Sequence, residues 1–271
     1  MFVWDPGLYR RFEDHRTRPF LDLLARIPIV DAALVADLGC GPGHLAPALA
    51  RRFPAAQLIG VDSSPGMIAA ARQALTGESA ARAQGSDLRD RLRFEVADAR
   101  TWQPPAPLDV LISNATLHWI EGHVDLMGHW LTLVRPGGVL AFGVPANFNA
   151  PSHRSIRELL GATRWQDRID PSVMESISVE SPPRYLEALL GLGATVDVWE
   201  STYYQVLTGE DPVLQWLRGT ALRPVLAALD PDEVPVFEAE LAEKLRAAYP
   251  PGPHGTVFPF RRLFAVAERA H

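Results

Sequence analysis

The chain has 271 residues, enough for one large α/β domain or for a core domain with a smaller addition. Hydrophobic residues make up 47% and charged residues 21%, which is ordinary for a folded globular protein, and no apolar run approaches the roughly 20 residues of a membrane-spanning helix. A net charge of −6 argues against a nucleic-acid partner, and the single cysteine, Cys40, excludes an internal disulfide and a cysteine-based zinc site. We therefore expect no metal, no membrane partner and no nucleic-acid partner; the oligomeric state stays open.

The N-terminal segment MFVWDPGLYRRFEDHR is too charged for a secretory signal, so we expect a cytoplasmic protein. Asp5 and Pro6 predict the start of the first helix, as its N-cap and its first helical residue. This helix is expected to reach about Arg26, with a bend where Arg18 precedes Pro19.

Strand-like and helix-like segments then alternate, which is typical of a parallel sheet covered by helices. The strands of this part are predicted at residues 34–38, 57–61, 93–97, 108–113 and 139–144. The helices between them are predicted at residues 44–53, from Ser64 onward and at 122–134. The small and polar segment Thr76 to Asp90 is expected to be an exposed insertion.

After Val144 the regular alternation of predicted strands and helices ends. Four further helices are predicted at residues 152–162, 182–190, 212–220 and 230–249, and two further strands at 194–200 and 258–268. Two late strands suit a seven-stranded sheet closed by an antiparallel hairpin. We expect an N-terminal helical lid (1–30), an α/β core (31–207, with a helical insertion at about 150–192), a helical substrate cap (208–256) and the last core strand (257–271).

The segment Asp37-Leu38-Gly39-Cys40-Gly41-Pro42-Gly43 lies between the first strand and its helix. Glycines there let the backbone turn sharply and approach a ligand closely. Asp37 either binds the ligand or only caps the turn. Cys40 is expected to be a small packed residue and not a nucleophile.

Polar residues end the next three strands, on the side where open α/β sheets bind ligands. Asp62 could accept hydrogen bonds from ribose hydroxyls. It could instead be the N-cap of the helix that starts at Ser64, although Ser63 and Ser64 also suit that position. At Asp98 the carboxylate, or the backbone of the following Ala99, could read an adenine amino group. Asn114 would lie beside the crevice, and Met67 would form either core or an adenine wall.

The turn also indicates which adenine cofactor binds. Dinucleotide sites usually read G-x-G-x-x-G and leave room for a pyrophosphate. This turn reads G-x-G-x-G, contains a proline and better suits a ligand without phosphates, such as the methionine tail of S-adenosylmethionine. Asp37 fits that cofactor because its ammonium group needs an acceptor.

The motifs DLGCGPG, VDSSPGMI, ADARTW, ISNATLHW and RPGGVLA resemble those of the class I S-adenosylmethionine-dependent methyltransferases. The resemblance implies their Rossmann-like seven-stranded sheet, here with an inserted helical cap. WDPGLY, RTRP, VDVWESTYY, TALRPVL and FPFRRLFAVA further resemble the branch whose members methylate trans-aconitate. The polar loop from Thr76 to Asp90 is longer than that branch leads us to expect.

This narrower resemblance implies a transferase that makes the monomethyl ester of trans-aconitate or a similar small polycarboxylate, releasing S-adenosylhomocysteine. Arginines and tyrosines should anchor the anionic substrate, because guanidinium pairs with carboxylates are short and directional. The candidates are Arg223, Tyr204, Tyr203, Arg16, Arg18, Arg261 and Tyr9. His118 and Trp119, beyond the fourth strand, are candidates to line the methyl-transfer cavity; no catalytic residue is required.

Two other functions stay open. The chain could methylate another small molecule or a carrier-bound acid of the malonyl-thioester type. It could also bind S-adenosylmethionine without turnover. Such binding proteins usually lack a substrate cap, whereas the sequence beyond Val144 predicts regular helices and strands.

Overall fold

The computed structural model describes residues 13–76, 87–170 and 179–271, with side chains of the first helix described from residue 17 onward. The chain forms two compact units. The core unit contains Arg16–Val144, Val179–Glu200 and Leu263–His271. The helical unit contains, in its described part, residues 13–15, 145–170 and 201–262. The chain therefore passes between the units several times, and the expected boundaries at residues 30, 207 and 256 differ from these.

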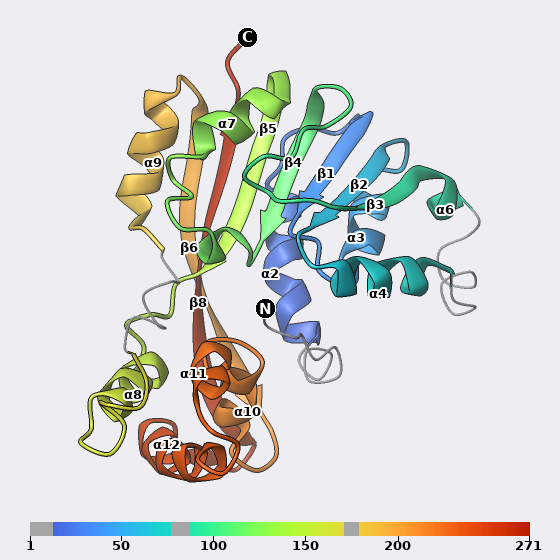
Figure 1. Ribbon diagram of the computed structural model, residues 1–271. Helices are drawn as coiled ribbons and strands as arrows, with labels where there is room; N and C mark the ends of the chain where they lie inside the picture. The colour runs from blue at the N-terminus through green and yellow to red at the C-terminus, as the bar shows by residue number, and fades with distance from the viewer. Residues whose placement is uncertain (1–12, 77–86, 171–178) are drawn as a thin grey trace. The chain divides into compact units, whose positions relative to one another are not determined.

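The sheet has the strand order β3-β2-β1-β4-β5-β8-β6 (Figure 1), and the two-residue strand β7 (Pro251–Gly252) pairs with β8. Its strands are β1 (Leu34–Leu38), β2 (Gln57–Asp62), β3 (Leu92–Val96), β4 (Leu108–Asn114), β5 (Val134–Pro145), β6 (Thr195–Leu207) and β8 (Gly255–Glu268). The four adjacent pairs from β3 to β5 are parallel. This mostly parallel α/β fold confirms the predicted fold class.

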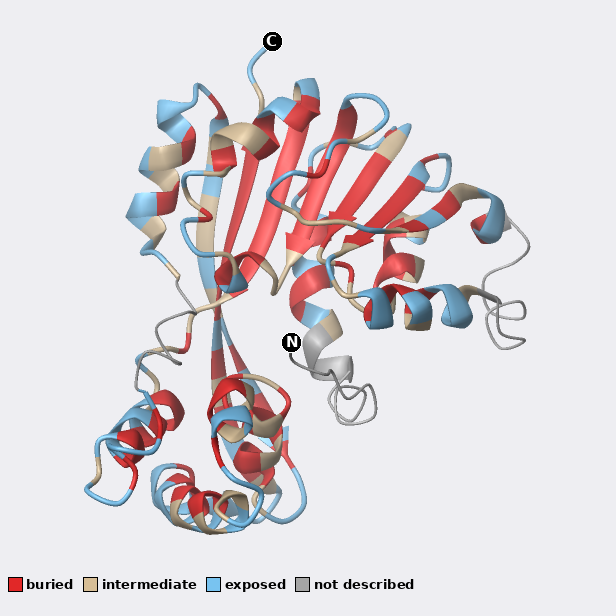
Figure 2. Ribbon diagram, viewed as in Figure 1, coloured by how far each residue is buried: buried red, intermediate tan, exposed pale blue. Residues whose placement is uncertain are grey.

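The central strands are buried along almost their whole length (Figure 2). Their apolar runs, such as LVADL in β1, lack polar alternation because helices cover both faces of a parallel sheet. Their register brings Asp37 opposite Gly60, Asp62 opposite Val96 and Asn114 opposite Gly143. The polar residues of the glycine turn and the strand ends therefore meet at one edge of the sheet.

The helices of the core unit follow the predicted alternation, with α6 and η1 in addition. They are α2 (Glu13–Ala25), α3 (Ala46–Arg52), α4 (Pro65–Thr76), α6 (Asp87–Arg91), the 3-10 helix η1 (Leu117–Trp119), α7 (Met127–Leu133) and α9 (Pro182–Gly191). Helices α3 and α4 pack on β2, and α7 packs on β4 and α9. The expected start of the first helix at Asp5 lies outside the described residues, as does most of the polar insertion, whose last four residues, 87–90, belong to α6.

Strand β5 begins earlier than expected. The segment Arg135-Pro136-Gly137-Gly138, predicted as a turn, is part of this strand. It pairs irregularly with β4, where the register shifts between Leu108 and Val110. Gly137 has a φ of +70°, and the Arg135 guanidinium pairs with Asp109 at 2.5 Å. A bulge of this kind lets a strand continue through residues that locally resemble a turn.

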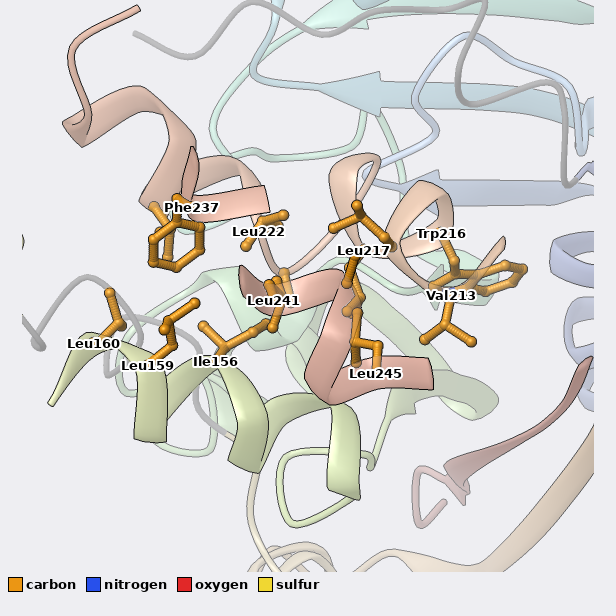
Figure 3. Close-up of a cluster of buried hydrophobic side chains, with 14 of the residues drawn as sticks. Ile156, Leu159, Leu160, Val213, Trp216, Leu217, Leu222, Phe237, Leu241 and Leu245 are labelled. Atoms are coloured by element: carbon orange, nitrogen blue, oxygen red, sulfur yellow. The ribbon is translucent and has the colours of Figure 1, made fainter. Parts of the chain in front are cut away.

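The helical unit has a hydrophobic core of its own (Figure 3). Its helices are α8 (Pro151–Leu160), α10 (Pro212–Arg218), α11 (Arg223–Ala228) and α12 (Val234–Ala248). Leu159, Trp216, Phe237 and Leu241 are each at most 4% exposed within it. In the part of the chain that the structure describes, no helix of either unit is long and apolar enough to cross a membrane.

Candidate active site

The turn after β1 is shaped by three glycines with positive φ: Gly39 at +82°, Gly41 at +54° and Gly43 at +75°. A Cβ on Gly39 would lie 2.1 Å from Oγ1 of Thr116, and one on Gly43 would lie 2.8 Å from the Phe94 ring. Neighbouring side chains therefore exclude any larger residue at Gly39 and Gly43. Sequence reasoning missed Thr116, although it belongs to the ISNATLHW motif.

Gly41 differs from the glycines on either side. A Cβ there would meet nothing within 4 Å, so no described protein atom requires glycine at this position through contact. Its backbone N–H donates to Oδ2 of Asp62 at 3.0 Å, which fixes the tip of the turn. A glycine that faces open space beside a carboxylate leaves room for a ligand to approach the backbone.

Asp62 is held in place from both sides. Its Oδ1 accepts from the Ser64 backbone N–H at 2.8 Å while Oδ2 accepts from Gly41. The cap of α4 is instead Ser64, whose Oγ accepts from the N–H of Met67 at 3.3 Å. The alternative in which Asp62 caps this helix therefore loses support. Ser63 is exposed beside it, and Met67 is buried at 6% exposure.

Asp37 is a buried carboxyl, 5% exposed, at the end of β1. Burial, reinforced by the nearby charge of Asp62, raises its pKa to about 7. Burial also raises the pKa of the Cys40 thiol, with Asp37 and Asp62 adding to the effect, which disfavours the thiolate that a nucleophilic cysteine needs. A carboxyl in this position would gain from a cation beside it, which is what an ammonium group supplies.

The carboxylate of Asp98 is engaged by hydrogen bonds within its own turn. Its carboxylate accepts three bonds from the Arg100 side chain, the shortest at 2.5 Å, and one from the Arg100 backbone at 2.9 Å. These hydrogen bonds lower the pKa of Asp98. Next to it, the Ala99 carbonyl accepts from the indole of Trp130 at 2.8 Å. The Asp98 carboxylate and the Ala99 carbonyl are thus both engaged by protein donors, which leaves the Ala99 N–H as a donor suited to a ring nitrogen of adenine and not to its amino group.

Asn114 and the segment after β4 lie at the same edge of the sheet as the glycine turn. Oδ1 of Asn114 is buried and has no hydrogen-bond partner among the described residues. Ala115 has a φ of +56°, a conformation that costs a residue other than glycine roughly 1–2 kcal/mol. Strain of this kind is common at functional sites. His118, 5% exposed, and Trp119, 38% exposed, follow on η1 with ring centroids 5.0 Å apart.

The predicted substrate residues belong to different parts of the chain. In the helical unit, Arg223 is half-buried at the start of α11 and Arg261 is exposed on β8. Tyr203 is 6% and Tyr204 72% exposed, because neighbouring residues of a strand point to opposite faces. The two tyrosines therefore cannot both line one pocket.

Three substrate candidates belong to the N-terminal segment. Arg18 is exposed on α2 in the core unit. Tyr9 and the side chain of Arg16 lie outside the described residues.

A cofactor with an ammonium group, a ribose and an adenine ring fits the core unit. Asp37 supplies a buried carboxylate, Gly41 an open approach, Asp62 a fixed carboxylate and Asn114 an unsatisfied amide oxygen. Groups of three or more potential metal ligands are absent from the described residues. A parallel sheet with these groups at its strand ends defines the class I methyltransferases.

Comparison with known proteins agrees with this class. Residues 35–138 match the family described as methyltransferase domain. The YcgJ protein of Bacillus subtilis has the same fold, with a TM-score of 0.57 at 14% identity over 95% of this chain and 99% of its own.

Relatives that match almost the whole chain indicate which methyltransferase family it belongs to. A trans-aconitate 2-methyltransferase of Streptomyces avermitilis is 51% identical over 98% of this chain and 97% of its own. One from Streptomyces coelicolor is 49% identical over 98% of this chain and 87% of its own. The chain belongs to the trans-aconitate 2-methyltransferase family.

Proposed function

We propose that the chain transfers the methyl group of S-adenosylmethionine to a carboxylate of trans-aconitate or of a closely similar small polycarboxylate. The observation that carries this proposal is the extent of the match. Identity of 51% over 98% of the chain includes the helical unit as well as the cofactor-binding core, whereas the methyltransferase domain alone ends at residue 138. A match confined to the cofactor-binding domain would not indicate which molecule accepts the methyl group.

The core unit holds the cofactor. Asp37 pairs with its ammonium group, Asp62 accepts from the ribose hydroxyls, and Ala99 and Asp98 lie at the adenine. Gly39, Gly41 and Gly43 form the turn, and Ser63, Met67 and Asn114 complete its surroundings. When bound, S-adenosylmethionine supplies a methyl group on a sulfonium, which leaves as the sulfur takes back the electron pair of the broken bond.

The acceptor needs no general base. A carboxyl group has an intrinsic pKa near ~4, so at neutral pH it is already the nucleophile. The protein then has to hold one carboxylate oxygen in line with the methyl group, and orientation of this kind supplies roughly 7–11 kcal/mol. His118 and Trp119 act here as walls that exclude water and not as proton carriers.

The other carboxylates of the substrate provide its anchors. The proposed partners of these carboxylates come from two parts of the chain. They are Arg223, Arg261 and Tyr204 of the helical unit, and Arg16, Arg18 and Tyr9 of the N-terminal segment. Tyr203 is the weaker tyrosine candidate because it is buried. Bidentate guanidinium–carboxylate pairs would select an acceptor with several negative charges in a fixed arrangement.

An acceptor panel tests the proposal. Purified protein is incubated with methyl-labelled S-adenosylmethionine and, separately, with trans-aconitate, cis-aconitate, citrate, a saturated tricarboxylate and a malonyl thioester. We expect kcat/KM to be highest for trans-aconitate, with a single methyl added per molecule by mass spectrometry. Preference for the thioester would identify a carrier-bound acid as the acceptor. Cofactor binding without turnover of any acid would identify a binding module.

A further inference from the structure

Two buried tryptophans of the core unit each donate one hydrogen bond of the same length from the indole N–H. Nε1 of Trp102 donates to Oε2 of Glu95, and Nε1 of Trp130 donates to the Ala99 carbonyl, both at 2.8 Å. Trp102 is 5% and Trp130 0% exposed. Only the Trp130 bond reaches the backbone that follows Asp98, from a residue 31 positions later in the chain.

The direction of the Ala99 N–H follows from the bonds of its turn. The Asp98 carbonyl accepts from the N–H groups of Thr101 at 3.1 Å and Trp102 at 2.9 Å, so it points into the turn. A trans peptide places the N–H of the next residue opposite to that carbonyl. The Ala99 N–H therefore points out of the turn, and within the described residues no protein acceptor is bonded to it.

The bond from Trp130 fixes the following peptide in the same way. It holds the Ala99 carbonyl, while the Arg100 N–H donates to Oδ1 of Asp98 at 2.9 Å. Peptides on both sides of the Ala99 α-carbon are thus restrained. The rigid helix α7 sets one of the two restraints through a side chain that packs in the core.

We infer that Trp130 is a positioning residue for the cofactor: by holding the Ala99 carbonyl it directs the Ala99 N–H at a ring nitrogen of adenine. The inference rests on the proposed function, because it presumes that the nucleoside lies at this turn. This role needs no contact between Trp130, which is fully buried, and the cofactor. It determines adenine recognition through the backbone, whereas the Asp98 carboxylate is engaged by Arg100.

The test compares two ligands and two matched variants by calorimetry. The ligands are S-adenosylhomocysteine and its 1-deaza analogue, in which a C–H replaces the acceptor nitrogen N1. The wild-type protein should bind the parent compound about tenfold more tightly, the effect of one net hydrogen bond. In Trp130→Phe this ratio should fall to about one. In Trp102→Phe, which loses an equivalent buried bond, it should stay near ten.

Discrimination is a readout that a merely structural role would not change. An undiminished ratio in Trp130→Phe, or an equal loss in Trp102→Phe, would overturn the inference. If Trp130→Phe does not fold, 3-benzothienylalanine at position 130 keeps the shape of the ring and removes only the N–H, and the same ratio decides. Wild-type protein that binds neither ligand would contradict the proposed function itself.

Discussion

Gly39 and Gly41 lie two residues apart in one turn, and both have a positive φ, yet different neighbours surround them. Thr116 packs directly on Gly39, whereas no described atom lies within 4 Å of a Cβ at Gly41. Glycine at position 39 is therefore required by the fold. At position 41 contact with the protein gives no such reason: only the left-handed φ favours glycine there, and the open space beside it is where we propose that the cofactor approaches the backbone.

This contrast predicts separate effects on stability and binding. Gly41→Ala should cost about 1–2 kcal/mol of stability through its left-handed φ, and should weaken S-adenosylhomocysteine binding at least tenfold because the methyl group occupies the approach. Gly39→Ala should be more destabilising because it clashes with Thr116. Urea unfolding and calorimetry of both variants give the two quantities. Wild-type affinity in a folded Gly41→Ala protein would place the ligand elsewhere.

The raised pKa of Asp37 predicts a pH-dependent affinity. A bound ammonium group favours the ionised carboxylate, so below pH 7 the free protein must release a proton when the ligand binds. Affinity for S-adenosylhomocysteine should therefore fall as the pH drops below about 7, by up to tenfold per pH unit, and level off above it. Asp37→Asn should bind weakly at every pH. Calorimetry between pH 5.5 and 7.5 measures both proteins, and a flat wild-type profile would contradict the role of Asp37.

At the scale of elements, helix α9 joins the core unit through one buried network. The Glu180 N–H donates to the Tyr185 hydroxyl oxygen at 3.2 Å, and Nε2 of His123 lies 2.7 Å from the same oxygen. Nδ1 of His123 lies 3.1 Å from the Ile120 carbonyl, so it carries the proton and Nε2 accepts from the tyrosine. Burial lowers the pKa of His123, which keeps this imidazole neutral.

Tyr185→Phe should therefore be destabilising by about 1–3 kcal/mol, because it leaves Nε2 of His123 and the Glu180 N–H without their partner. Tyr204→Phe is the control, since its hydroxyl is on a side chain that is 72% exposed. Urea unfolding of the two variants measures the difference. Equal stabilities would mean that α9 is held by apolar packing alone.

Sequence patterns located the central strands of the core well, because β1, β2 and β4 are short, largely apolar runs that end at or just before a polar or glycine residue. They missed the start of β5, where Arg135 and Gly137 form a bulge that locally resembles a turn. They also missed Trp130 and Tyr185. The hydrogen bonds of these residues join positions 31 and 62 apart, and only the folded chain brings such partners together.

For the whole molecule, the proposed work is divided between the two units. The described cofactor candidates and one substrate candidate, Arg18, belong to the core unit, whereas the other described substrate candidates, Arg223, Arg261, Tyr203 and Tyr204, belong to the helical unit. The sequence indicated the cofactor residues through their place at strand ends. It gave no comparable rule for the substrate residues, because an arginine that anchors a ligand and one on the surface look alike in a sequence.

This division predicts that substrate and cofactor binding can be altered separately. Arg223→Lys should raise the KM for trans-aconitate about tenfold and leave the Kd for S-adenosylhomocysteine unchanged, since lysine lacks the bidentate fork. Arg164→Lys is the control, because Arg164 is an exposed partner of Glu240 in the same unit. Steady-state kinetics and calorimetry measure the two constants. A parallel loss of both would indicate damage to the fold.

The bend after β1 and the acidic groups beside it form the proposed site for a nucleoside that carries a sulfonium or thioether. Calorimetric titration of the wild-type protein with S-adenosylhomocysteine tests it most directly. We expect saturable binding with one ligand per chain, and an affinity about ten- to hundredfold lower in Asp62→Ala, which lacks the carboxylate bonds to the ribose. Absence of binding, or unchanged binding in a folded Asp62→Ala protein, would contradict it.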